Sequence, residues 1–139
     1  MTARFEWYGG QVIASVEAAK KTALTAACKI VQTDAKADCP VDQDELRPSI
    51  VYKVFTDDAK VGTNVDYAPH VEFGTKAHTI KVKSAKVLTD GKKFFGKVVN
   101  HPGTVAQPFL RPALDNNRTK ITKLIGDFLG NAAERGGKK

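Results

Sequence analysis

The chain has 139 residues, with 22 Lys and Arg against 15 Asp and Glu, and therefore a formal net charge of +7 at pH 7. Its length predicts one domain, residues 1–139, and its 42% of hydrophobic residues exclude disorder as the main description. No apolar run approaches the roughly 18 residues of a membrane helix and the N-terminus lacks a secretory signal, so we expect a protein made in a cytoplasm, with no membrane partner.

A long amphipathic helix is predicted first, over residues 11–37. Small and apolar residues recur there near a 3.6-residue period, without Pro or Gly. We expect Gly9 and Gly10 to break the chain before this helix, and the segment leading to Pro40 to end it. Its Ala-rich face favours close packing against another element or another subunit.

A β-hairpin and a short helical or loop segment are predicted next. The β-branched and aromatic residues of 48–55 and the residues 59–64 indicate two strands, joined by a turn at Asp57 and Asp58. Residues 67–73, closed by Gly74, are expected to form a single helical turn or a buried loop.

The middle of the chain predicts a second, extended hairpin over residues 76–100. Its strands are expected at 79–88 and 92–100, because Asp90 and Gly91 between them are a strong tight-turn signal. Its seven lysines against Asp90 give a local charge of +6, which is nearly the whole excess.

A C-terminal helix is predicted from about residue 111 to residue 134, followed by a flexible basic tail at 135–139. Helices at both ends and strands between them indicate the α+β class. We therefore expect a long N-terminal helix and a C-terminal helix packed on a small, mainly antiparallel sheet, with a protruding basic hairpin.

No motif in the sequence predicts catalysis, a metal site or a cofactor. His70 begins a His-x-Glu sequence, but the cysteines that a zinc deaminase would add are absent, and His70, His78 and His101 are interpreted as unrelated surface or loop residues. Phosphate-binding loops and nucleophile elbows are also absent. We expect Cys28 and Cys39 to be reduced thiols, with Cys28 packed as a small apolar residue.

The basic hairpin has two interpretations. Its charge could contact nucleic-acid phosphates, which would make binding depend steeply on salt. Lysines also protect the edges of sheets, and Phe94 and Phe95 are adjacent, so they would point to opposite faces. We favour a protein-docking surface, whose candidate residues are Lys81, Lys83, Lys86, Lys92, Lys93 and Lys97.

Three segments of the sequence resemble one protein family. PVDQDELRPSI, VGTNVDYAPHVEFGT and HPGTVAQPFLRPALD, in this order, resemble the small head–tail joining, or tail-completion, proteins of the neck of long-tailed bacteriophages and prophages. The match positions are Tyr67, Pro69, Glu72, Phe73, Gly74, Gln107, Pro108, Phe109, Leu110 and Arg111. We expect most of them to form the fold at a junction of sheet and helix, with Phe109 and Leu110 buried.

This resemblance implies a non-enzymatic virion protein without cofactors. It would assemble with copies of itself, as a hexameric ring, and would contact the head connector or an adaptor ring on one side and the tail tube or its terminator protein on the other. DNA would be met only in passing through the channel. The alternative is a basic nucleic-acid-binding module.

Overall fold

The structure, a computed structural model, describes residues 7–40, 45–81, 88–89, 94–96 and 98–137. By its internal contacts the chain divides into two compact units: a helical unit, Met1–Val65 with Phe109–Lys139, and a hairpin unit, Asp66–Pro108. The predicted α+β class is confirmed, because a long N-terminal helix packs against a C-terminal helix and all strand pairs in the described residues are antiparallel. The single domain over residues 1–139 stays a prediction.

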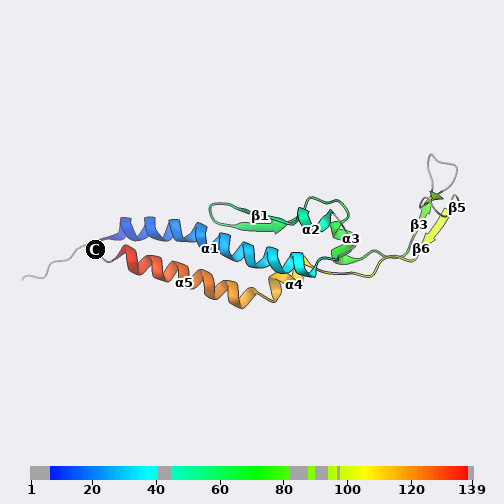
Figure 1. Ribbon diagram of the computed structural model, residues 1–139. Coiled ribbons are helices and arrows are strands. Elements are labelled where there is room, and N and C mark those ends of the chain that lie inside the picture. Colours follow the sequence, from blue (N-terminus) through cyan, green and yellow to red (C-terminus); the bar gives the residue numbers. More distant parts are fainter. Residues whose placement is uncertain (1–6, 41–44, 82–87, 90–93, 97, 138–139) are drawn as a thin grey trace, which may run out of the picture. The chain divides into compact units, whose positions relative to one another are not determined.

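The helical unit is built on α1 (Gly9–Asp38), which lies beside α5 (Arg118–Gly136) in the opposite direction (Figure 1). The two helices approach closely at the end of α5, where a Cβ on Gly136 would lie 2.8 Å from the Cα of Val12. The expected break at Gly9 and Gly10 is wrong. Both glycines are helical, because the Tyr8 carbonyl accepts the first amides of the helix, and the long helix therefore starts two residues earlier than predicted.

The buried apolar core of the helical unit lies along α1 from Ala23 onward and includes residues that cover this stretch. Its buried apolar residues are Ala23, Ala27, Cys28, Val31, Ala35, Cys39, Leu46, Ile50, Phe109 and Ala113. Four of the α1 positions recur at every fourth residue, which places them along one face of the helix. In the described part of α1, no residue before Ala23 is fully buried.

The predicted C-terminal helix is interrupted. It consists of α4 (Leu110–Asp115) and α5, with Asn116 and Asn117 between them. The Asn117 side chain is buried and its amide donates to Asp34 Oδ2, at 2.5 Å, and to the Ala113 carbonyl, at 2.9 Å. These bonds take Asn117 out of the regular helix, so one continuous helix from residue 111 to residue 134 is wrong.

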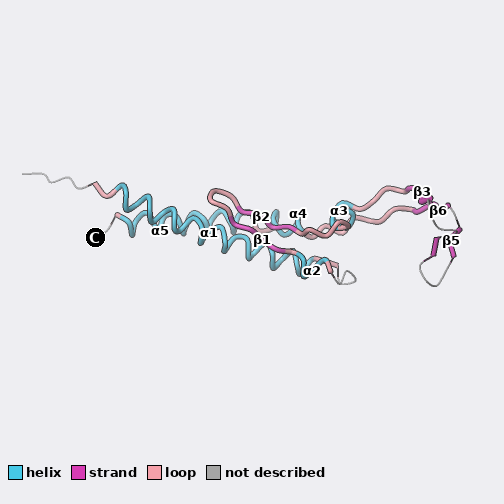
Figure 2. Tube along the Cα trace, turned by 90° about the horizontal axis from the view of Figure 1, so that it is seen from above, coloured by secondary structure: helices cyan, strands magenta, loops and turns pink. Residues whose placement is uncertain are grey.

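The first predicted hairpin is confirmed. Strands β1 (Val51–Val54) and β2 (Ala59–Gly62) pair antiparallel, with Val51 opposite Gly62, and Phe55 N donates to Asp58 O at the turn. The hairpin lies along α1 (Figures 1 and 2), and Figure 1 shows it on the side away from α5.

The chain enters this hairpin through a short helix, α2 (Leu46–Ser49), so the expected strand start at Pro48 is wrong. The Ser49 hydroxyl bonds the Leu46 carbonyl and the Thr63 hydroxyl, which fixes the turn before the strand. Gln32 of α1 then donates to the Ile50 carbonyl at 2.8 Å.

The hairpin unit begins with α3 (Ala68–Phe73), which confirms the expected helical turn. Strands β3 (His78–Lys81) and β6 (Val98–His101) pair antiparallel, as do β4 (Leu88–Thr89) and β5 (Phe94–Gly96). The second hairpin is thus confirmed as two short ladders; the predicted turn at residues 90–91 lies outside the described residues. No helix in the described part of the chain is long and apolar enough to cross a membrane.

Candidate assembly surfaces

The basic hairpin is represented in the described residues by Lys81 alone of the six docking candidates. Lys81 ends β3 opposite Val98, and its side chain is exposed. The other five candidates, Lys83, Lys86, Lys92, Lys93 and Lys97, lie outside the described residues. Their role in docking stays a prediction.

The motif residues around α3 form one local structure. Tyr67 precedes the helix, Pro69 lies in its first turn and Glu72 is buried, whereas Phe73 is exposed. The backbone amide of Gln107 donates to the Val71 carbonyl at 2.8 Å. Two motif segments that are more than thirty residues apart in the chain therefore meet within the hairpin unit.

Two glycines hold these segments in close contact. Gly74 has φ 70° and Gly103 has φ 91°, the left-handed region that L side chains rarely adopt. Each glycine is followed by a threonine, Thr75 or Thr104. The backbones of these two threonines exchange both amide–carbonyl hydrogen bonds, at 2.9 and 3.1 Å. A Cβ on Gly103 would overlap the Thr75 carbonyl oxygen. Gly103 and Thr104 are not among the match positions of the sequence analysis, although a Pro-Gly pair such as the one before Thr104 is typical of a turn.

The remaining motif residues lie at the end of the hairpin unit and the start of α4. Pro108 is exposed, and Phe109, which precedes α4, has no exposed surface, as predicted. Leu110 is only half-buried, so its expected burial is not met, and Arg111 is exposed. As first residues of a helix, Leu110 and Arg111 turn partly away from the core that Phe109 enters.

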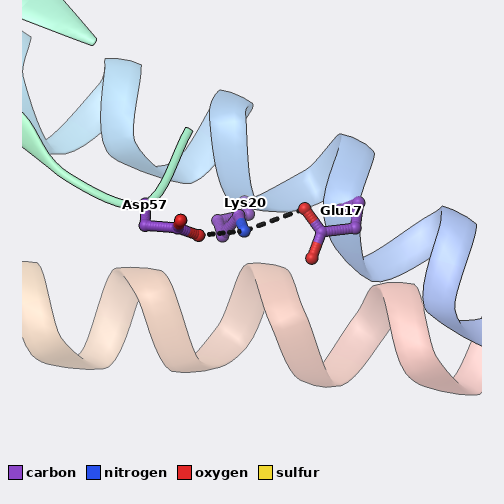
Figure 3. Close-up of polar contacts among 3 residues, drawn as sticks. All are labelled: Glu17, Lys20 and Asp57. Carbon is purple, nitrogen blue, oxygen red and sulfur yellow. Dashed lines mark hydrogen bonds and ion pairs between the residues drawn. The ribbon is translucent and has the colours of Figure 1, made fainter. Parts of the chain in front are cut away.

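An ion-pair cluster fixes the first hairpin to α1. The Lys20 ammonium lies 2.7 Å from Asp57 Oδ1 at the hairpin turn and 2.8 Å from Glu17 Oε2 one helical turn away (Figure 3). Hydrogen bonds to Asp57, which has the larger effect, and to Glu17 raise the pKa of Lys20. The sequence identified Asp57 only as a turn residue, since its partner is 37 positions earlier.

The interpretation of the three histidines as unrelated is wrong for two of them. His78 and His101 are directly opposite in the β3–β6 ladder, and their ring centroids are 5.1 Å apart. His78 Nδ1 bonds the Lys76 carbonyl, and the Gly103 amide donates to His101 Nδ1. Strand register, which the sequence did not define to one residue, brings them together.

Both cysteines are free and Cys28 is buried, as expected; Cys39 is buried as well, which was not predicted. Burial raises the pKa of the Cys28 thiol and of the Cys39 thiol, and the charge of Arg47 opposes the shift at Cys39. Among the residues that the structure describes, no group of three His, Cys, Asp or Glu could hold a metal ion.

Comparison with models of protein families gives a match over the N-terminal half of the chain. A family model described as "Bacteriophage HK97-gp10, putative tail-component" matches residues 1–74. The matched region takes in α1, the β1–β2 hairpin and α3, and ends at Gly74. No curated protein and no solved structure matches the chain.

Proposed function

The chain belongs to the HK97-gp10-like family of bacteriophage tail components, and from this we propose that it is a non-enzymatic structural protein of the virion that acts at the head–tail junction. It assembles there, or at the end of the tail tube, to complete the tail and join it to the head. The family match over more than half of the chain is the observation that carries the proposal.

We infer from this assignment that the chain is not an enzyme, because a structural component of a tail acts by binding. A subunit of this kind meets several other proteins at once, and several features of the chain suit that use. The described surface exposes large apolar side chains, including Trp7, Ile13, Phe73 and Val105, in both units. In the proposed assembly, neighbouring proteins would cover side chains of this kind.

Assembly with identical copies is the second part of the proposal. A hexameric ring would present one face to the head connector or an adaptor ring and the other to the tail tube or its terminator protein. In a closed ring each subunit contributes two different surfaces, so one element must reach the next subunit or the next ring. The basic hairpin of residues 76–100 is the element that we propose for this contact, with an acidic neighbour as its partner.

The experiment is a joining assay. Deletion of the gene from its phage should leave DNA-filled heads and uncompleted tails unjoined in the lysate, and addition of the purified protein should restore infectious particles. Intact virions from the deletion, or a lysate without filled heads, would show that the chain acts elsewhere.

The hairpin contact is tested in the same assay with paired charge reversals. K81E/K83E should abolish joining while the far-ultraviolet circular dichroism spectrum stays that of the wild type. K21E/K29E makes the same change in net charge on exposed positions of α1 and is the matched control. Equal activity of the two variants would contradict a docking role for the hairpin.

The charge of the hairpin also favours one alternative, a nucleic-acid-binding module. That alternative requires binding to duplex or single-stranded DNA with a steep dependence on salt. A joining protein should show little DNA binding at about 150 mM salt, because DNA binding that depends on charge alone weakens steeply as the salt concentration rises. Filter binding over a salt series separates the two.

A further inference from the structure

A groove between α1 and α5 is not used by the contacts described so far. It has a volume of about 530 Å³ and is lined by small residues of α1, among them Ala18, Ala19 and Thr22, and by polar residues of α5, among them Asp127, Asn131 and Arg135. Both helices belong to the helical unit, and the groove runs along the part of α1 that precedes the buried core.

The β1–β2 hairpin does not cover this groove. Lys20, whose ammonium is bonded to Asp57 at the hairpin turn, is two residues from both Ala18 and Thr22. Two residues correspond to roughly 200° around a helix, so the hairpin contacts the opposite side of α1 from the groove.

Packing of the two helices is incomplete along this stretch. In the described part of α5, Gly136 is its one fully buried residue, and Phe128, which lines the groove, is only half-buried. Two helices side by side bury one stripe each, and a further layer is needed to cover the apolar residues at the edges of the stripes.

The charged residues that α5 contributes to the groove can pair with those of a second α5. Asp127 and Arg135 are eight residues apart, about two helical turns, and Asn131 lies midway between them on the same stripe. Neither Asp127 nor Arg135 has an ion-pair partner among the described side chains. If a second α5 lies antiparallel across the first, centred on Asn131, each Asp127 faces the partner's Arg135.

We propose that this groove is a two-fold interface between two copies of the chain, in which α5 of each copy lies along the α1–α5 groove of the other. The contact is isologous: the same residues face one another on both sides, and it closes on two copies. It is therefore distinct from the head-to-tail contacts of a ring, and it holds whether or not the protein joins heads to tails.

Reciprocal charge reversal tests the proposal. The full chain should form a dimer in sedimentation equilibrium. D127R and R135D should each raise the dimer dissociation constant about tenfold or more, because each reversal places two like-charged pairs in the interface. D66R carries the charge change of D127R in the hairpin unit and should dimerise as the wild type does.

Mixing the two variants provides the decisive measurement. D127R and R135D mixed in equal amounts should form a heterodimer. The positive charge introduced at position 127 of one copy then faces the negative charge introduced at position 135 of the other. The native Arg135 of the first copy likewise faces the native Asp127 of the second. The double variant D127R/R135D should form a homodimer for the same reason. A purely structural role of either residue would not produce rescue by mixing.

Three results would overturn the proposal. They are a wild-type protein that remains monomeric at the highest concentration reached, single variants that dimerise as the wild type does, and single variants whose mixture stays monomeric. The last result would also follow if the copies met through two different surfaces. The joining assay is independent of all three.

Discussion

Replacement of Gly103 by Ala tests the close contact that holds the motif segments of the hairpin unit. Gly103 has φ 91°, and its missing side chain leaves room for the Thr75 carbonyl. Alanine at this position would have to keep a left-handed backbone and displace the backbone of Thr75 and Lys76 beside it. We therefore expect the Thr75–Thr104 contact to open.

The magnitude follows from two costs. A left-handed conformation costs an L residue about 1–2 kcal/mol. The Cβ would also overlap backbone atoms of Thr75 and Lys76, which cannot rotate away as a side chain can, and relief of such overpacking costs about 1–3 kcal/mol. Together they predict a loss of about 2–5 kcal/mol of local stability in the hairpin unit.

Hydrogen exchange of the two bridging amides measures this loss directly, because segments of a protein open with their own free energies. The amides of Thr75 and Thr104, bonded at 2.9 and 3.1 Å, should lose protection by about 30-fold or more. Gly126→Ala is the matched control: a Cβ there meets nothing within 4 Å, and Ala should stabilise α5 by about 1 kcal/mol. Unchanged exchange in Gly103→Ala would refute the reasoning.

Three further predictions concern the helical unit and use the free energy of unfolding. Asn117→Ala should lower it by about 1–3 kcal/mol in urea denaturation, because a half-buried carboxylate of α1 and a helix carbonyl lose their donor; an unchanged midpoint would contradict this. Phe109→Ala should cost about 3–5 kcal/mol, whereas Val105→Ala, 84% exposed, should have little effect; equal losses would argue against Phe109 as a core residue. Burial raises the pKa values of both thiols, so stability should fall as the pH rises above about 8.5, where the thiols of the unfolded chain ionise and those of the folded chain do not. In thermal melts across this range, the stability of a double Cys28→Ala and Cys39→Ala variant should fall less steeply with pH.

Those parts of the fold that depend on local patterns could be predicted from the sequence. The apolar period of residues 11–37 has its counterpart in α1, and the turn residues Asp57 and Asp58 indicated the β1–β2 hairpin. The break at Asn117 could not be predicted in the same way. Its cause is a hydrogen bond to Asp34, 83 positions earlier, and no local pattern encodes that distance.

The candidate surfaces show the same limit. The sequence indicated the motif segments, but not that Gln107 bonds Val71 or that His78 faces His101, because a ladder register is set by both strands together. The groove between α1 and α5 was anticipated only as an Ala-rich face that favours close packing. Its position and charges required the antiparallel arrangement of the two helices.

Electron cryomicroscopy of purified virions, with this chain identified in the density, tests the structural role at the head–tail junction. The long α1–α5 helix pair should appear in a closed ring between the head connector and the first ring of the tail tube. Absence of the chain from the virion, or its location away from this junction, would rule out this role.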